Sequence, residues 1–452
     1  MNDELRVKNN ELGGKMKYRY RTDEEMKDSG VEWIGEIPKE WSITKLKYIS
    51  CCEDGKRVPL SSDERGKMQG DIPYWGANSI IDYVNDYLID YEVVLLGEDG
   101  APFFDKTKPV AFYSNGKIWT NNHIHILKSQ KDMDSRFLVN SLNIVDYKNY
   151  IKGSTRDKLT QADMKEIIIQ IPKLKKEQIK ISKFLDEKTA QFDSIISKKE
   201  ALIEKLEEAK KSLISEVVTG KVKVVKSSDG YELVERKKEE MKDSGVGWLG
   251  DIPKKWNVKK IKYISKIYRG KFNHRPRNDP EFYDGEYPFI QTGDVANSNM
   301  YITKYTQTLN KKGYSVSKEF PKGTLIMTIA ANIGDIAILD FNACFPDSIV
   351  GFTPNNNIDI KFMYYIYSIM KEEFMSTAII NTQMNLNVER IENLFIVVPN
   401  IEKQKIIVDY IESKLGNIMN TINKVRQQIQ KLKEAKQSLI SEAVTGRIEI
   451  LD

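Results

Sequence analysis

The sequence predicts an α+β protein in which two pseudo-repeated α/β domains are separated by two long helices that form an antiparallel coiled coil. Two observations lead to this fold class. Internal repeats divide the chain into matching halves, and each half ends in an apolar stripe of helical period. The length of 452 residues agrees, because one hydrophobic core rarely organises so long a chain.

The repeats are near-copies. "MKDSGVEWIGEIPKEWSITKLKYIS" at 26–50 and "MKDSGVGWLGDIPKKWNVKKIKYIS" at 241–265 share 17 of 25 positions, and "KLEEAKKSLISEVVTGKV" at 205–222 shares 13 of 18 with 431–448. These boundaries predict six segments: an N-terminal polar segment (1–25), a first α/β domain (26–175), a first helical region (176–222), a linker (223–240), a second α/β domain (241–400) and a second helical region (401–452).

Both helical regions carry apolar residues at steps of four and three, as a coiled-coil seam requires. The second seam is Ile411, Leu415, Ile418, Ile422, Val425, Ile429, Leu432 and Leu439, with Lys436 as its polar break. The first is Leu185, Phe192, Ile196, Ile203, Leu206 and Leu213, weakened at Thr189, Lys199 and Lys210. Helices with one apolar edge need a partner, so we expect each to pair with the other and to end at Gly220 and Gly446.

Composition places the chain among soluble, reduced proteins. The hydrophobic fraction of 40% and the charged fraction of 30% are ordinary for globular domains. The three cysteines include no C-x-x-C pair, so we expect neither disulfides nor a metal site. The polar N-terminus resembles no signal peptide, so we expect neither export nor a membrane, and the expected location is the cytoplasm. "HIH" at His123 and His125 is expected to be a strand with polar residues outward rather than a metal site.

Between the repeats lie segments of β character that barely resemble each other, such as "YEVVLLGEDG", "KIWTNNHIHILK" and "GTLIMTIAANIGDIAIL". A repeated frame around divergent segments is expected where the frame sets geometry and the segments set what is bound. The alternative is a duplication that builds only a structural pseudo-dimer.

Two recognition domains held a fixed distance apart suit a double helix, whose half-sites repeat at about 34–36 Å. The net charge of +5 is a weak sign of a polyanionic partner. Both halves contain a Gly-Lys pair, Gly55-Lys56 and Gly270-Lys271, and the loops that follow it differ in sequence. Their basic and amide side chains suit contacts with phosphates and bases. The candidate DNA-binding residues are Lys56, Arg57, Asn78, Ser154, Thr155, Arg156, Lys271, Asn273, His274, Arg275, Arg277 and Gln291. Solvated basic loops, or a plain turn at 150–158, are the competing interpretations.

The order of these motifs resembles the specificity (S) subunit of type I restriction-modification systems. The resemblance rests on "W-x-G-x-I-P-x-x-W" at Trp33 and Trp248, on "GSTRDKLTQADMKEIIIQIPKLKKEQIKISKFLD", and on "EAKQSLISEAVTGRI". It implies two target recognition domains for an asymmetric bipartite DNA target. It also implies docking of two adenine methyltransferase (M) subunits and two restriction (R) motor-nuclease subunits. S-adenosylmethionine, ATP and magnesium would belong to those partners, and no cofactor to this chain.

Catalytic motifs are absent from the sequence. An adenine methyltransferase needs an Asn/Asp-Pro-Pro loop and a motor needs a phosphate loop, and the chain contains neither. Asp347 followed by Asp359 and Lys361 imitates a magnesium nuclease pattern, although Asp359 is better explained as the start of a helix. The sequence therefore predicts a non-catalytic subunit. A coiled-coil adaptor without sequence-specific DNA binding is the alternative.

Overall fold

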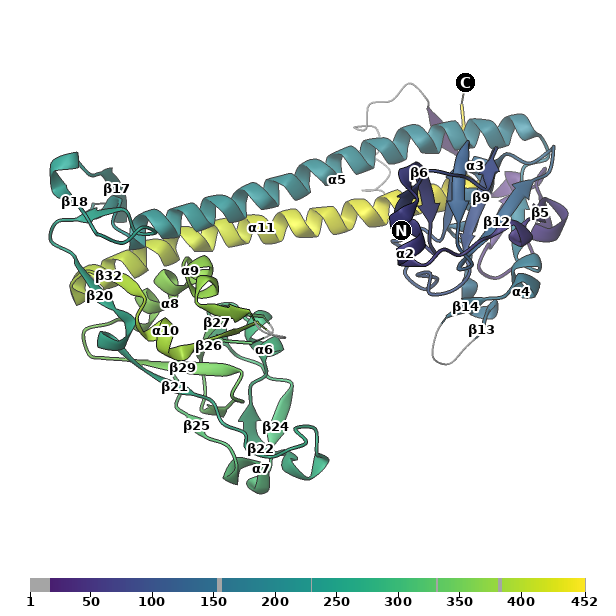
Figure 1. Ribbon diagram of the computed structural model, residues 1–452. Helices are drawn as coiled ribbons and strands as arrows, with labels where there is room; N and C mark the ends of the chain where they lie inside the picture. The colour runs from purple at the N-terminus through teal and green to yellow at the C-terminus, as the bar shows by residue number, and fades with distance from the viewer. Residues whose placement is uncertain (1–16, 153–156, 229, 331, 381–383, 452) are drawn as a thin grey trace. The chain divides into compact units, whose positions relative to one another are not determined.

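The computed structural model describes residues 17–152, 157–228, 230–330, 332–380 and 384–451 (Figure 1). They form two compact units. Unit 1 combines the chain up to Ala201 with the chain from Val425 onward, and unit 2 is Leu202–Lys424. Both units contain part of each of the two long helices, α5 (Lys175–Val218) and α11 (Ile401–Val444).

Unit 1 contains the first α/β domain. Its further helices and strands are β1 (Tyr18–Tyr20), β2 (Met26–Asp28), β3 (Glu36–Pro38), β4 (Ser42–Lys45), β5 (Ser50–Cys52), α2 (Ser62–Lys67), β6 (Gln69–Trp75), β7 (Ile80–Val84), β8 (Ile89–Asp90), β9 (Val93–Gly97), β10 (Ala111–Ser114), β11 (Lys117–Thr120), β12 (Ile124–Ser129), α3 (Ser135–Leu142), β13 (Ile151–Lys152), β14 (Lys158–Leu159), α4 (Gln161–Lys165), β15 (Ile168–Ile171) and β33 (Ile448–Ile450).

Unit 2 contains the second α/β domain. Its further helices and strands are β16 (Val222–Ser227), β17 (Gly230–Glu235), β18 (Met241–Asp243), β19 (Asp251–Pro253), β20 (Asn257–Lys260), β21 (Ser265–Arg269), β22 (Tyr283–Phe289), α6 (Thr292–Ala296), β23 (Tyr301–Ile302), β24 (Gln307–Leu309), α7 (Lys311–Ser315), β25 (Glu319–Phe320), β26 (Leu325–Thr328), β27 (Ile336–Leu339), β28 (Ala343–Cys344), β29 (Ile349–Pro354), α8 (Ile360–Ser368), α9 (Lys371–Ser376), β30 (Ala378–Ile380), β31 (Met384–Leu386), α10 (Val388–Glu392) and β32 (Phe395–Val398).

The divergent segments share one topology. In unit 1 a sheet of order β10-β9-β12-β5 accompanies a second sheet of order β7-β6-β11-β8, and unit 2 repeats both as β27-β26-β29-β21, extended by β23, and β24-β22-β28-β25. A parallel pairing recurs at the same place, between β6 and β11 and between β22 and β28, and unit 2 adds a second one between β23 and β27. Apolar side chains at alternating strand positions therefore build the same core from unlike sequences.

The repeated frame also recurs strand by strand. β4 pairs with β15 as β20 pairs with β32, and β2 with β3 as β18 with β19. At the frame's edge, Tyr18 of β1 faces Ile450 of β33, and Leu233 of β17 faces Val224 of β16 in the equivalent register. The segment expected to be a linker thus forms a β-hairpin in unit 2, and the two ends of the chain make the same pairing in unit 1.

The long helices pair antiparallel within each unit. In unit 1 the first half of α5 packs its buried Leu185 and Phe192 in one core with Leu439 and Val444 of α11. In unit 2 the end of α5 shares a core with the beginning of α11, where Ile214 lies with Ile407 and Ile411. The predicted coiled coil is confirmed.

The polar breaks of the two seams are matched across the helix pair. Lys436 forms an ion pair with Asp193 at 2.7 Å, and the Lys199 ammonium donates to the Gln428 amide oxygen at 2.8 Å. In unit 2 the Lys210 ammonium lies 3.7 Å from the Met419 sulfur. Each of these three lysines therefore faces a polar or polarisable partner, which limits its cost in a half-buried seam. The Thr189 hydroxyl instead donates to the Leu185 carbonyl of its own helix at 2.7 Å.

Each long helix ends at a left-handed glycine that contacts the repeated "I-P-x-x-W" motif. Gly446 has φ of +75°, and a Cβ added there would lie 2.5 Å from Pro38. Gly220 has φ of +78°, and a Cβ there would lie 2.7 Å from Pro253 and from Trp256. Glycine is required twice over, by the backbone angle and by this close approach.

The segment "LTQADMKEIIIQIP" is a strand only in part, although its apolar run suits a strand throughout. It begins as the short helix α4, because the Thr160 hydroxyl caps that helix by accepting from the Asp163 amide, and only Ile168–Ile171 form strand β15. The expected helix beginning at Asp359 is confirmed, with its carboxylate accepting from the Lys361 and Phe362 amides. Among the described helices, none is both long and apolar enough to cross a membrane.

Substituting Gly446 with alanine is expected to lower the free energy of unfolding by at least about 1–2 kcal/mol, the cost of a left-handed backbone with a Cβ. The matched control is Gly416→Ala, because Gly416 lies inside α11 with no atom within 4 Å of an added Cβ. That change should raise stability by about 0.5–1 kcal/mol. Urea denaturation of both variants checks this, and shifts of the same sign would contradict it.

Candidate nucleic-acid interface

The candidate residues lie at four described places. Lys56 and Arg57 follow β5, and Asn78 lies between β6 and β7. Lys271, Asn273, His274, Arg275 and Arg277 lie between β21 and β22, and Gln291 precedes α6. Ser154, Thr155 and Arg156 lie outside the described residues.

Lys56 belongs to a small basic and aromatic cluster. Its exposed ammonium donates to the Tyr91 hydroxyl at 2.5 Å and to the Glu53 carboxylate at 3.0 Å, and these contacts raise its pKa. Lys128 lies over the same tyrosine ring, 4.9 Å from its centre. Sequence reasoning missed Tyr91 and Lys128, because Tyr91 lies between β8 and β9 and Lys128 on β12, and only the pairing of the strands brings them to Lys56.

Arg57 points inward. Its guanidinium forms an ion pair with Glu98, lies 3.5 Å from the Asp54 carboxylate and donates to the Ile124 carbonyl at 3.2 Å. A guanidinium has five N–H donors in a rigid plane, so it can bind several acceptors at once. These contacts favour anchoring of the loop by Arg57, whereas its predicted contact with DNA stays a prediction.

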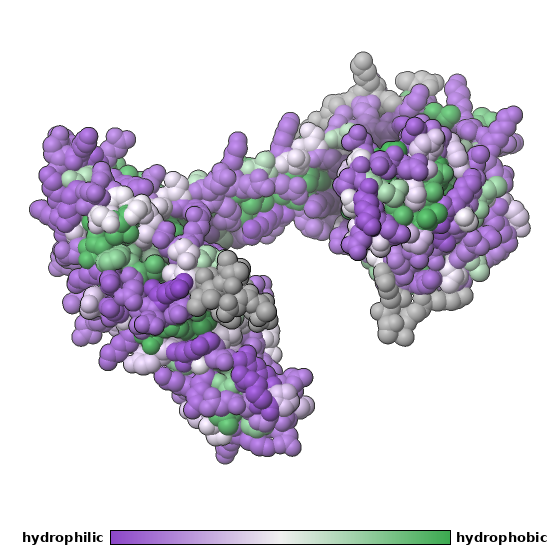
Figure 2. All heavy atoms as spheres, in the orientation of Figure 1, coloured by the Kyte–Doolittle hydropathy of each residue, from purple (hydrophilic) through white to green (hydrophobic). Residues whose placement is uncertain are grey.

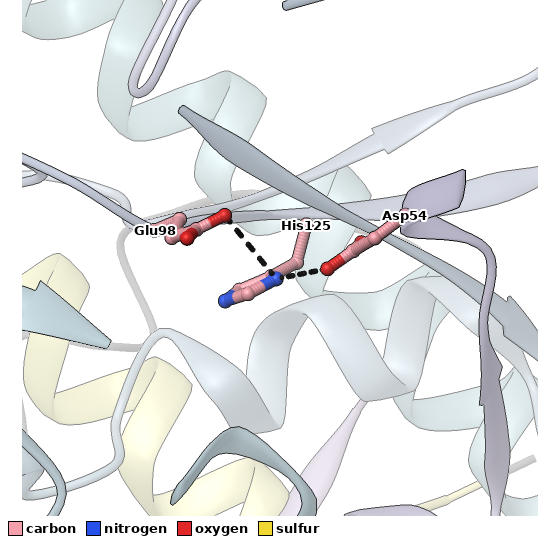
Figure 3. A group of neighbouring side chains, drawn as sticks. All are labelled: Asp54, Glu98 and His125. Atoms are coloured by element: carbon pink, nitrogen blue, oxygen red, sulfur yellow. Dashed lines mark hydrogen bonds and ion pairs between the residues drawn. The ribbon is translucent and has the colours of Figure 1, made fainter. Parts of the chain in front are cut away.

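Beside Arg57 lies a buried cluster of Asp54, Glu98 and His125 (Figure 3). The expectation that His125 points outward is wrong: its side chain is 1% exposed. Nδ1 lies 2.6 Å from Asp54 Oδ2 and Nε2 lies 2.9 Å from the Leu159 carbonyl oxygen, so acceptors at both nitrogens satisfy the buried ring. His123, by contrast, is partly exposed and lies 3.3 Å from Asp99.

This cluster has the geometry of an internal ion-pair network. Its possible ligand atoms lie within 4.8 Å of one another, which a metal ion would also require. However, the Glu98 carboxylate already pairs with Arg57 and Lys158, and Asp54 faces His125 and Arg57. A cation would have to displace these positive groups, so the residues present fit a self-contained network better than a metal site.

The second loop is held by its own aromatic and acidic residues. The His274 ring stacks on Phe282 with centres 3.9 Å apart, and its Nε2 lies 3.0 Å from the Asp279 carboxylate. Because backbone and His274 contacts hold the carboxylate, the pKa of Asp279 is lowered. His274 thus fastens the loop internally, and its predicted DNA contact remains a prediction.

Arg275 and Arg277 remain on the surface and share one carboxylate. Their side chains are 55% and 45% exposed, Arg275 lies 3.6 Å from Asp347, and Arg277 forms an ion pair with the same group. Exposed ion pairs are weak, so the Arg277 guanidinium is available to a stronger anion. One nitrogen of the Arg275 guanidinium also donates to the Phe272 and His274 carbonyls at 2.8 Å, which leaves its other nitrogen for a ligand. Lys271 and Asn273 are exposed beside them, and among the described residues their side chains contact no hydrogen-bond partner.

The remaining candidates are divided between exposed and internal positions. Asn78 is exposed, whereas the half-buried Gln291 side chain donates to the Gln307 amide oxygen at 2.7 Å. Trp75, expected to be core, packs against buried apolar residues and lies 5.2 Å from the Phe112 ring centre.

The nuclease-like pattern is divided among unrelated contacts. Asp347 pairs with the two loop arginines, Asp359 caps α8, and the Lys361 ammonium lies 2.7 Å from Glu412 of α11. Each group therefore has a structural partner of its own.

Replacing Asp54 with asparagine should lower the free energy of unfolding by about 3–5 kcal/mol, because it removes the carboxylate at Nδ1 of the buried His125 and one of the two carboxylates that Arg57 contacts. Although burial alone would raise it, contact with His125, the Ile126 amide and Arg57 lowers the pKa of Asp54 from 3.8 to about 2. A lowered pKa means that this stability is present above pH 3.8 and is lost as pH falls toward 2.

The variant should therefore lose that part of the wild-type pH dependence, measured by urea denaturation between pH 2 and pH 6. Asp63→Asn, at an exposed position of α2, is the control and should behave as wild type. Equal stability of the Asp54 variant and wild type at pH 6 would contradict the network.

Comparison with known proteins agrees with the repeated fold. The family model of the "Type I restriction modification DNA specificity domain" matches residues 38–208 and 253–434. A putative type I restriction enzyme specificity subunit of Haemophilus influenzae is 28% identical over 393 residues, covering 85% of this chain and 89% of the relative. The MjaVIII specificity subunit of Methanocaldococcus jannaschii is 24% identical, covering 92% and 94%.

The fold has a solved counterpart as well. A chain from a structure described as "complex assembly and conformational transition of the type I R-M system" aligns over 90% of this chain and 98% of its own length, with a TM-score of 0.57 and 14% identity. That similarity concerns the fold alone. Because the two family matches coincide with the two α/β domains and their helices, the protein belongs to the family of type I restriction-modification DNA specificity domains.

Proposed function

We propose that this chain recognises an asymmetric, bipartite target on double-stranded DNA for a type I restriction-modification complex and performs no chemistry itself. Its two domains would each recognise one half-site. The observation that carries the proposal is one sheet topology presenting different side chains at the equivalent loop, Lys56 and Arg57 in one domain and Lys271 to Arg277 in the other.

Base recognition is best supported at the second loop. Guanine offers two acceptors that an arginine fork can bind together, and adenine is similarly matched by asparagine. Arg275 and Arg277 carry such forks at the surface, and Asn273 lies beside them. Arg277 is paired with Asp347, and Arg275 also donates to the Phe272 and His274 carbonyls at 2.8 Å, so Arg277 has the freer fork. The stacking of His274 on Phe282 holds the loop in place, which reduces the conformational entropy that the loop would lose on binding.

Phosphate contact is best supported at the first loop. Lys56 and Lys128 flank Tyr91, so two ammonium groups and a hydroxyl gather at one place. Such groups position a protein on the duplex without specifying sequence. Ser154, Thr155 and Arg156 stay proposed phosphate ligands on sequence grounds alone.

Docking of two methyltransferase subunits requires two equivalent surfaces, and the frame supplies a candidate pair. Tyr48 and Tyr263 occupy the same repeat position and are 63% and 65% exposed, among the most exposed of the large hydrophobic side chains described, while hydrophilic residues cover most of the face shown in Figure 2. Exposed tyrosines are frequent anchors of protein interfaces. Their repetition in both halves favours a partner present in two copies.

One lysine lies over each tyrosine ring in the same way, Lys47 5.3 Å from the centre of Tyr48 and Lys262 5.4 Å from the centre of Tyr263. Lys45 and Lys47 bind the Glu166 carboxylate at 2.5 and 2.6 Å. In unit 2, Lys260 and Lys262 donate to the Asn393 side-chain oxygen at 3.3 and 3.1 Å. Because Glu166 holds the lysines of unit 1, the tyrosine is the group left for a partner there. We propose that both surfaces dock methyltransferase subunits and that restriction subunits join the resulting complex.

The DNA proposal is tested by Arg275→Gln with Arg277→Gln. Methylated adenines are first mapped in cells that co-express the chain and its cognate methyltransferase subunit, which yields the target. Binding is then measured on duplexes with one half-site scrambled. The variant should lose at least about 30-fold in affinity for one half-site only, since each of the two arginine–guanine pairs contributes about 1–3 kcal/mol.

Lys322→Gln with Lys371→Gln is the control, because it removes two positive charges from ion pairs elsewhere in unit 2. If the arginine variant lost the same affinity for every DNA sequence, the loop would contact phosphates and not bases. Methylation without any sequence restriction would favour the coiled-coil adaptor instead.

The docking proposal is tested by Tyr48→Ala and Tyr263→Ala, separately and together. Loss of an interface tyrosine costs about 2 kcal/mol, or about 30-fold in affinity. Native mass spectrometry should show one bound methyltransferase subunit for each single variant and almost none for the double variant. Tyr83→Ala, at a 49% exposed tyrosine of β7, should retain two. Unchanged stoichiometry in the double variant would refute the assignment.

A further inference from the structure

Both units contain an arginine that closes the end of a long helix. The Arg21 guanidinium donates to the Gly446 carbonyl at 2.8 Å, and Arg236 donates to the Gly220 carbonyl at 2.7 Å. Beside each lies the buried tryptophan of the repeated motif, Trp41 or Trp256. The two sites are counterparts in geometry up to this point.

The two sites differ in the charge of the side chain that lies beside the arginine and the tryptophan. In unit 1 the Glu177 carboxylate accepts from both Arg21 and the Trp41 indole, each at 3.2 Å. Glu177 directly precedes Gln178 in the sequence. The equivalent of Gln178 in unit 2 is Gln404, because each glutamine side chain donates to the carbonyl of a preceding proline and accepts from the backbone amide of a helix-capping aspartate. The residue before Gln404 is Lys403. Unit 2 therefore places a cation where unit 1 has the anion that neutralises its arginine.

The reversed charge lines a cavity of about 490 Å³ in unit 2. Five cationic and two acidic side chains line it: Lys223, Arg236, Lys254, Lys255, Lys403, Glu239 and Glu240. The Lys403 ammonium donates to the Val224 carbonyl, a neutral group. Burial, and then repulsion from Arg236 and Lys223, lowers the pKa of Lys403. Burial also lowers the pKa of Arg236, against the opposing effect of Glu240.

The cavity opens at the beginning of α11, a helix of 44 residues. The Asn400 side chain lines the cavity and accepts from the Lys403 amide at 2.9 Å, which caps this end. The N-terminus of a long helix carries partial positive charge and attracts anions. Helix dipole and cationic side chains therefore act in the same direction. Among the described residues of unit 2, no carboxylate forms an ion pair with Arg236 as Glu177 does with Arg21.

We propose that this cavity of unit 2 binds a compact phosphate group, either as a free polyphosphate or as part of a nucleotide. Arginine and lysine together bind phosphate through charge-assisted hydrogen bonds. The volume lies within the range of small-ligand pockets, and its recessed position suits a small ligand better than the backbone of a duplex. The inference is independent of which DNA sequence the chain recognises.

The test is calorimetric titration of the full chain with inorganic pyrophosphate and, separately, with adenosine 5′-monophosphate. Wild type should bind one equivalent, and tighter binding of one probe identifies the free or the nucleotide source. Lys403→Glu should weaken binding at least about tenfold, because it creates the arginine–glutamate pair that unit 1 already contains. Its fold should be retained for the same reason. Lys223→Gln should also weaken binding about tenfold, without a new acid.

Lys424→Glu makes the same charge reversal at an exposed position of α11 and should bind both probes as wild type does. No binding to wild type, or wild-type affinity in Lys403→Glu, would overturn the proposal. It would also fall if a short DNA duplex displaced pyrophosphate and lost affinity equally in Lys403→Glu, because the cavity would then belong to the DNA interface.

Discussion

The close contact between a helix-ending glycine and a Pro–Trp pair is the constraint on which the fold depends. Gly446 lies against Pro38 and Trp41, and Gly220 against Pro253 and Trp256. In each unit, the end of one long helix is thereby fixed to the motif that opens an α/β domain. The same unit also receives the beginning of the other helix. This is the physical reason why "I-P-x-x-W" and "TGK/R" are each present twice: neither motif is useful without the other.

The contact also explains how the domains diverged without loss of the fold. The frame strands β4–β15 and β20–β32, with the helices, retain their pairing in both units. Within this support, the sheets need only apolar residues at inward positions, and many sequences satisfy that requirement. Loops at the sheet ends do not need apolar residues at fixed positions, so the arginines of the second loop have no equivalents in the first. Recognition chemistry can change where packing does not depend on it.

The sequence alone was sufficient for the frame and insufficient for the recognition surface. Repeats, heptads and terminal glycines are local patterns, so they predicted the helix pairing, the helix ends and the cap at Asp359. Contacts between distant strands leave no such pattern. Nothing near His125 indicates Asp54 as its partner, and nothing near Lys56 indicates Lys128. The shared sheet topology was equally invisible, because alternating apolar residues specify strands but not their order.

The internal repeat provides its own comparison for electrostatics. Two equivalent positions of the repeat change charge between the units, Glu166 to Asn393 beside the exposed tyrosine, and Glu177 to Lys403 beside the helix-closing arginine. Stability of the frame cannot require these charges, since one of the two copies folds without each acid. Where geometry is retained and charge is not, the charge is free to serve binding. The asymmetry of this protein therefore extends beyond the loops proposed to recognise DNA into the frame that supports them.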